Sequence, residues 1–200
     1  MEKLSVIIQA GGGSQRMGQD KGLVNFLGQP LISRVAQRLR PIAAELLVTT
    51  NRPQDYTFLG LPLFGDLLPG TGALGGLFTA LSAAAYPLAA VVACDMPFAN
   101  PALLAAEGEW LLQAGFDLVL PRTASGLEPF HAVYRRLACL PHIQAALSAG
   151  KRRVDAWFGE VRVGELLPPE ILKYDPLQLA FLNVNTPSEL AEAEQIAKSQ

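Results

Sequence analysis

Short apolar runs alternate with segments of helical periodicity along the chain. The runs are four to six residues long and nearly continuous, which is typical of strands buried on both faces of a sheet. We expect strands at residues 5–8, 45–50, 61–64, 88–93, 116–120, 130–134 and 181–184. Helical spacing, or a helix-start signal, predicts helices at residues 31–39, 73–85, 101–114, 141–149 and from 187 onward.

Two of these helices have explicit boundary signals. Pro141 is expected in a first turn, and Gly150 follows the last periodic residue as a stop signal. Thr186 and Glu189 have the spacing of a capping box, with Pro187 between them at the first helical position. The alternation of strands and helices predicts an α/β fold, with a mostly parallel sheet and helices on both faces. No repeat or linker interrupts residues 1–200, so we expect a single domain.

Composition excludes several function classes. Sixteen basic residues against eighteen acidic ones give a net charge of −2, so bulk charge does not attract nucleic acid. Residues 67–94 contain no charged side chain, but Pro87 divides them into pieces too short to span a bilayer, and we expect no membrane association. Cys94 and Cys139 have neither disulfide-framework nor zinc-site spacing, which favours a reducing, cytoplasmic location.

A glycine-rich loop follows the first strand. Gly11, Gly12 and Gly13 allow the backbone to approach a phosphate or base closely, although a tight turn would also use them. A dinucleotide fingerprint would need glycine where Arg16 stands, and a phosphate-binding P-loop would need Lys and Ser or Thr after Gly18. Both motifs therefore fail. Arg16 and Lys21 remain as two cations able to neutralise a polyphosphate.

Polar residues also follow other predicted strands. Asp95 ends the most apolar strand, where a carboxylate can hold Mg²⁺; the alternative, a helix N-cap, is less favoured because Met96 and Pro97 begin a helix poorly. Asn51 and Asp66 either contact a ligand or are ordinary turn residues. No Ser-His-Asp or Cys-His arrangement is evident, and we expect His131 and His142 to be structural.

Five ordered motifs span nearly the whole chain: GGGSQRMGQDK at 11–21, GALGGL at 72–77, ACDMPF at 93–98, GKRRV at 150–154 and NVNTP at 183–187. Together they resemble the motifs of the nucleotidyltransferases, and of the molybdenum cofactor guanylyltransferases in particular. Gln9 and Ala73 depart from the family pattern, which usually has Leu and Pro there. The resemblance implies the Rossmann-like three-layer sandwich of the nucleotide-diphospho-sugar transferase type.

The resemblance also implies a reaction, namely Mg²⁺-dependent transfer of GMP from GTP to a terminal phosphate of molybdopterin, with pyrophosphate leaving. Arg16, Lys21 and Asp95 would be catalytic, with Asp95 as the metal ligand. The nucleotide-binding residues would be Gln9, Ala10, Gly11, Gly12, Gly13, Lys21, Asn51, Asp66 and Asp95. Transient contacts with proteins that deliver molybdopterin or mature molybdoenzymes would fit the same role.

The acceptor side is expected from the last two motifs. Asn183 and Asn185 would share one face of the predicted strand at 181–184 and its end, and would bind molybdopterin. Arg152 and Arg153 would bind the pterin phosphate or, equally, be solvated surface charges. Two alternatives stay open. One is cytidylyl transfer to molybdopterin or another small phosphorylated acceptor, and the other is a non-catalytic nucleotide-binding regulatory subunit.

Overall fold

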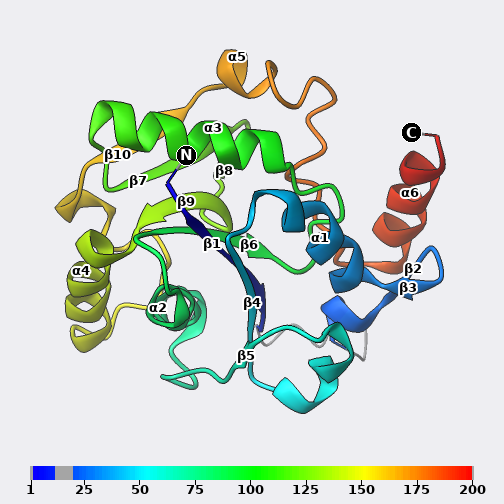
Figure 1. Ribbon diagram of the computed structural model, residues 1–200, viewed down its shortest axis with the longest axis horizontal. Coiled ribbons are helices and arrows are strands. Elements are labelled where there is room, and N and C mark those ends of the chain that lie inside the picture. The colour runs from blue at the N-terminus through cyan, green and yellow to red at the C-terminus, as the bar shows by residue number, and fades with distance from the viewer. Residues whose placement is uncertain (1, 12–19, 200) are drawn as a thin grey trace.

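The computed structural model describes residues 2–11 and 20–199, and within them an eight-stranded sheet lies between two layers of helices (Figure 1). The strand order is β10-β7-β9-β6-β1-β4-β5, with β8 paired to β7. The strands are β1 (Leu4–Ala10), β4 (Glu45–Thr50), β5 (Leu63–Phe64), β6 (Leu88–Ala93), β7 (Leu118–Thr123), β8 (Gly126–Leu127), β9 (His131–Arg135) and β10 (Val163–Leu166). A separate hairpin joins β2 (Asn25–Phe26) to β3 (Gln29–Pro30).

Most neighbouring strands of the large sheet run parallel. β9 is antiparallel to both β6 and β7, and β8 is antiparallel to β7, whereas β1, β4, β5 and β6 form a continuous parallel block. The six α-helices of the described residues are α1 (Leu31–Leu39), α2 (Gly72–Ala83), α3 (Pro101–Ala114), α4 (Arg136–Ser148), α5 (Pro168–Ile171) and α6 (Pro187–Lys198). Short 3₁₀ turns are η1 (Lys21–Leu23), η2 (Arg40–Ile42), η3 (Pro53–Leu59) and η4 (Phe158–Glu160). The predicted mostly parallel α/β architecture is confirmed.

Alternate residues of the central strands enter different cores. On β1, Val6 and Ile8 belong to the core that includes α1 and α3, whereas Ile7 belongs to the core that includes α2 and α4. Figure 1 shows these two pairs of helices on opposite faces of the sheet. All three side chains are fully buried. Burial on both faces explains why these strands are apolar without alternation. A third cluster lies beneath α6, and we call it the satellite core: Phe26, Leu31, Phe98, Val184 and Ala193.

The last predicted strand is wrong. Residues 181–184 form no strand, and the backbone N–H of Val184 donates to the carbonyl of Asp95 at 2.9 Å instead. The Val184 side chain is buried in the satellite core, so its apolar character serves that cluster and not the sheet. The capping box at Thr186 and Glu189 is confirmed and begins α6 directly after this extended segment.

Two further differences come from tertiary contacts. The fourth helix begins at Arg136, five residues before the predicted start, and Pro141 lies inside it. Arg136 donates to the carbonyl of Leu81, and the thiol of Cys139 donates to the carbonyl of Asp117, so the early turn is held by its neighbours. The edge strand β10 was not predicted, because its sequence Val-Gly-Glu-Leu has too few apolar residues to signal a strand.

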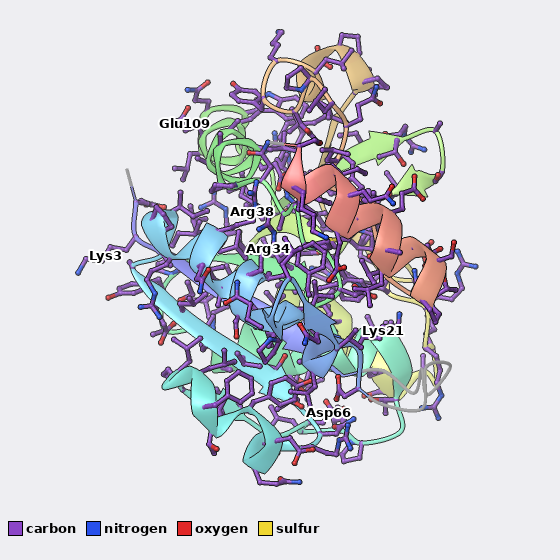
Figure 2. All side chains as sticks on the ribbon, turned by 90° about the vertical axis from the view of Figure 1, so that its right-hand side faces the viewer. Lys3, Lys21, Arg34, Arg38, Asp66 and Glu109 are labelled. Atoms are coloured by element: carbon purple, nitrogen blue, oxygen red, sulfur yellow. The ribbon has the colours of Figure 1, made fainter. Side chains whose placement is uncertain are left out.

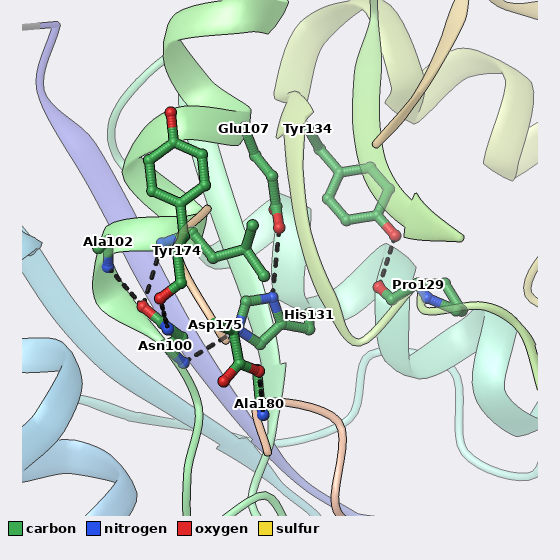
Figure 3. A network of polar contacts seen from close by, with 10 residues as sticks. Asn100, Ala102, Glu107, Pro129, His131, Tyr134, Tyr174, Asp175 and Ala180 are labelled. Carbon is green, nitrogen blue, oxygen red and sulfur yellow. Dashed lines mark hydrogen bonds and ion pairs between the residues drawn. The ribbon is translucent and has the colours of Figure 1, made fainter. Parts of the chain in front are cut away.

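A buried polar network fixes α3 against β9 (Figure 3). Asn100 caps α3 through its side chain, and its own N–H donates to Nε2 of His131 at 3.1 Å. Since Nε2 accepts this bond, Nδ1 carries the proton and faces Oε1 of Glu107 at 3.3 Å. Burial raises the pKa of Glu107 well above its usual range and lowers the pKa of His131 to about 4. As the sequence led us to expect, this histidine is structural.

No helix among residues 2–11 and 20–199 combines the length and apolarity that crossing a bilayer requires.

Candidate active site

The candidate site lies at the carboxyl ends of β1, β4 and β6. β1 is central, and the chain continues to β4 on one side of it and to β6 on the other, so the strand order reverses at this point. Ala10 pairs in register with Thr50, and Gln9 pairs with Ala93, which brings the following loops to one edge of the sheet. Ligands of open α/β sheets bind at such reversal points.

Lys21, Asp95 and Asn185 meet directly at this edge. The Lys21 ammonium donates to Oδ2 of Asp95 at 2.9 Å and also donates to Oδ1 of Asn185. The side chains of Lys21 and Asp95 are 19% and 13% exposed, so the ion pair is screened by water only in part. Three segments far apart in sequence therefore bring a cation, a carboxylate and an amide into one cluster.

Backbone contacts hold the two charged residues in place. Asp20 caps η1 by accepting from the N–H of Gly22, which fixes the turn that begins at Lys21. The N–H of Cys94 donates to the carbonyl of Gln9 at 3.1 Å, which ties the start of the Asp95 loop to β1. Burial raises the pKa of the Cys94 thiol, so the thiol stays protonated and is a poor nucleophile.

A small pocket adjoins the ends of β1 and β4. Its lining residues are Gln9, Gly11, Thr49, Thr50, Asn51, Asp66 and Gly76. Four of these were predicted to bind nucleotide, so the fold brings Gln9, Gly11, Asn51 and Asp66 together. The hydroxyl of Thr79 on α2 donates to Oδ1 of Asp66 at 2.8 Å and accepts from the N–H of Leu67. This contact restrains the Asp66 carboxylate at the pocket, where the carboxylate can accept from a base N–H.

The sequence did not identify two polar side chains in this pocket as a pair. Gln9 and Thr49 are register partners on β1 and β4, and both are buried. Within the described residues, neither Oε1 of Gln9 nor Oγ1 of Thr49 has a hydrogen-bond partner. Gly76 makes room for the glutamine, since a Cβ atom there would lie 2.1 Å from Nε2 of Gln9. The GALGGL motif is thus partly explained by packing against Gln9.

The remaining predicted residues are dispersed. The Arg152 guanidinium donates to the carbonyl of Gly70, and the Arg152 carbonyl accepts from the N–H of Leu74, so this residue lies beside the N-terminus of α2. Arg153 is 83% exposed on its side chain and pairs with Asp155 at 2.8 Å. Asn183 donates to the carbonyl of Phe181 within its own loop. Because no strand forms there, the prediction that Asn183 and Asn185 share a strand face is wrong.

Ala10 is the buried last residue of β1, directly before the pocket residue Gly11. Gly12, Gly13 and Arg16 lie outside the described residues.

Comparison with known proteins agrees with this geometry. Residues 6–163 match the MobA-like NTP transferase domain. The chain is 37% identical over 195 residues to a protein of Pelotomaculum thermopropionicum named probable molybdenum cofactor guanylyltransferase, covering 96% of this chain and 93% of that one. It is 31% identical to the molybdenum cofactor guanylyltransferase of Desulfosudis oleivorans, covering 100% of this chain and 98% of that one.

Solved structures of related proteins also superpose on this chain. Molybdopterin-guanine dinucleotide biosynthesis protein A from Archaeoglobus fulgidus superposes with a TM-score of 0.85 at 26% identity, covering 98% of this chain and 100% of that chain. The 2-C-methyl-D-erythritol 4-phosphate cytidylyltransferase of Thermus thermophilus has a TM-score of 0.71 at 20% identity, covering 98% and 99%, and shares the fold. The expected nucleotidyltransferase-type sandwich is confirmed, and the chain belongs to the MobA-like NTP transferase family.

Proposed function

We propose that this protein transfers GMP from GTP to a terminal phosphate of molybdopterin and releases pyrophosphate. The observation that carries the proposal is the Lys21–Asp95 pair at the strand-order reversal, beside a pocket containing Asp66 and Asn51. A cation and a carboxylate suit a triphosphate, and a fixed carboxylate acceptor suits the N–H groups of guanine. The names of the relatives support this choice of substrates.

The nucleophile in this reaction belongs to the acceptor substrate. A phosphate oxygen of molybdopterin attacks the α-phosphorus of GTP, a new P–O–P linkage forms, and the bond to the pyrophosphate breaks. The protein is needed for positioning and for stabilising negative charge. Lys21 would donate to the phosphate oxygens that become pyrophosphate, and the proposal gives Arg16 the same task.

Mg²⁺ is part of the proposal, and Asp95 is the residue that would hold it. Carboxylate oxygen is a ligand that Mg²⁺ favours, and Mg²⁺ commonly uses one or two carboxylates together with substrate phosphates. The donor set fits that mode, because Asp95 supplies one carboxylate, 13% exposed, at the edge of the sheet where the triphosphate would lie. When bound, the ion would neutralise charge on the triphosphate.

The acceptor side is assigned to Asn183, Asn185, Arg152 and Arg153. Of these four residues, Asn185 is the one whose contact with the Lys21–Asp95 pair is direct, since its amide oxygen accepts a hydrogen bond from Lys21. The proposal also includes a single catalytic domain, a cytoplasmic location and transient contacts with proteins that handle molybdopterin.

A labelling experiment tests the substrates. The protein is incubated with Mg²⁺, molybdopterin and one α-³²P nucleotide at a time, from GTP, CTP, ATP and UTP, and labelled dinucleotide is separated from free nucleotide. We expect label from GTP above all others. Label from CTP instead would support the cytidylyl alternative. Nucleotide binding without transfer by any of the four would support a regulatory subunit.

A further inference from the structure

The Lys21–Asp95 contact joins two loops that, in the part of the chain that the structure describes, are connected by no strand pairing. Lys21 begins η1, which leads into β2, whereas Asp95 follows β6. Something outside the pair must fix the distance between these loops, because a partly exposed ion pair contributes too little to do so alone. The satellite core lies behind the pair and contains one aromatic ring from each loop, Phe26 and Phe98.

Arg34 of α1 contacts both of these rings. Its guanidinium carbon lies 5.2 Å from the ring centre of Phe26 and 5.5 Å from that of Phe98. The two rings meet edge to face, with centroids 6.5 Å apart. A guanidinium over an aromatic face is attracted by the ring quadrupole, more strongly when it is partly desolvated. Arg34 is partly buried, and Figure 2 shows it with Lys21 from the side that α1 and α6 cover.

A hydrogen bond adds direction to this contact. Nε of Arg34 donates to the carbonyl of Pro97 at 3.1 Å, two residues after Asp95. One turn later, Nε of Arg38 donates to the carbonyl of Ala99 at 3.0 Å. Two arginines on one helix face thus hold consecutive parts of the Asp95 loop, but the cation–π contacts that reach Phe26 and Phe98 come from Arg34.

The satellite core also reaches the third member of the site. Val184 packs in it and donates its N–H to the carbonyl of Asp95, and the next residue is Asn185, which binds Lys21. On the other side, the N–H of Leu27 donates to Glu194 of α6. All three loops that carry the site are therefore packed on the same small cluster.

We infer that Arg34 is a positioning residue, which holds the Lys21 loop against the Asp95 loop and so sets the geometry of the ion pair. Arg34 acts through Phe26, Phe98 and the carbonyl of Pro97 and has no part in the chemistry. The inference rests on the proposed function for its effect on turnover, but its effect on Lys21 is independent of the substrates. Displacing a catalytic group by about 1 Å can slow a reaction roughly 100-fold.

Arg34→Met is the test variant, since methionine keeps an apolar chain against both rings while losing the charge and the hydrogen bond. Arg34→Lys keeps the charge. Arg40→Ala is the matched control, because Arg40 is exposed just after α1. Ile143→Ala, in the core on the opposite face of the sheet, supplies a variant of lowered stability with these loops intact.

Two measurements are made on each variant. The first is kcat and KM for GTP in the labelling assay, well below the melting temperature. The second is the rate at which a limiting acylating reagent modifies Lys21 without substrate, relative to Lys3, quantified by mass spectrometry. Lys21 is shielded by its two partners, so modification reports how freely its amine is reached.

We expect Arg34→Met to lower kcat roughly tenfold with KM nearly unchanged and to raise Lys21 modification several-fold. Arg34→Lys should restore most of the wild-type kcat and most of the wild-type protection of Lys21 from modification. Arg40→Ala and Ile143→Ala should change neither kcat nor Lys21 modification. If kcat or Lys21 modification in Arg34→Met equals the wild-type value, or if Ile143→Ala reproduces both changes, the inference is wrong. If the wild-type protein does not use GTP, the proposed function fails, and Lys21 modification alone decides the role of Arg34.

Discussion

Nζ of Lys21 lies 2.9 Å from Oδ2 of Asp95, although 74 residues separate them in sequence. Each group is the counter-ion of the other, so substituting either one leaves a partly buried charge without its partner. The two substitutions nevertheless have different expected effects, because the proposed function gives the lysine to the phosphates and the carboxylate to the metal.

Asp95→Asn should lower turnover by roughly 100-fold or more while leaving the fold intact, because the proposed metal ligand loses its charge. Initial rates over a Mg²⁺ titration, with circular dichroism as a check on folding, measure the effect. Glu165→Gln, on the edge strand β10, is the control, since it removes an exposed ion pair with Arg122 away from the site. Normal rates for Asp95→Asn at limiting Mg²⁺ would contradict the metal assignment.

Lys21→Ala should reduce kcat more than it weakens GTP binding, since its charge is proposed to act on the developing pyrophosphate. Single-turnover rates and the Kd for GTP, measured on the same preparation, separate the two effects. A weaker Kd with unchanged kcat would instead restrict Lys21 to ground-state binding.

Substitutions of Asn183 and Asn185 should have different effects. Asn185→Ala removes an acceptor of the Lys21 ammonium and should lower kcat with little change in GTP affinity. Asn183→Ala should leave GTP binding unchanged and weaken molybdopterin binding by about 1–3 kcal/mol, the range expected if a buried polar group of the bound pterin loses its hydrogen-bond partner. Titrating each ligand separately, together with a thermal melt, checks this. Equal losses for both ligands with a lowered Tm would mean that the amides only stabilise the loop.

In a double-mutant cycle, the effect of Gly76→Ala on the free energy of unfolding should change sign when Gln9 is also substituted. Gly76→Ala alone should destabilise by about 1 kcal/mol, the lower end of the overpacking range, because its Cβ would overlap the Gln9 amide, which is the flexible end of that side chain and can shift. In a Gln9→Ala background the same substitution should stabilise by up to about 1 kcal/mol, since alanine is the better helix former. Urea unfolding of the four proteins gives the coupling. Additive effects would show that the two residues are not in contact.

The free energy of unfolding of Glu107→Gln should increase relative to that of the wild type as the pH rises. Burial raises the pKa of Glu107, so the folded wild type holds a proton that the unfolded chain has released, and its stability falls as pH rises from about 4.5 through the raised pKa. The slope for one group is at most about 1.4 kcal/mol per pH unit. His131, whose pKa is lowered to about 4, makes both proteins less stable as pH falls from 6.5 to 4. Parallel stability curves above pH 5 would rule out the carboxyl effect.

Much of the fold was predictable because the strands are buried on both faces. In a chain of this length, short continuous apolar runs such as residues 88–93 are best explained as strands buried on both faces of a sheet. The same criterion failed at residues 181–184, since an apolar residue buried under a helix looks like one buried in a sheet. Pro141 misled for a different reason: a proline is disfavoured inside a helix, whereas here contacts made by Arg136 and Cys139 hold the helical turn before it.

The positions of candidate site residues were predictable where those residues follow the end of a strand. Asn51, Asp66 and Asp95 lie at one edge because parallel strands end together, so position along each strand was sufficient. The Arg34 contacts were not predictable, since they depend on which helix face meets which loop, and the Gln9–Thr49 pair was not predictable, since it depends on strand register. Register between β1 and β4 was the missing information, and an apolar pattern does not specify the register of two neighbouring parallel strands.

The Lys21–Asn185 contact has a consequence for synthesis of the chain. The two residues are 164 positions apart, and residue 185 lies beyond the matched domain region, which ends at 163. Chains are made from the N-terminus and fold progressively as they emerge. A ribosome-bound chain that ends before Val184 has all of the large sheet's strands but lacks the amide on Lys21 and the N–H on Asp95. All residues of the large sheet are therefore synthesised before the residues that complete the site.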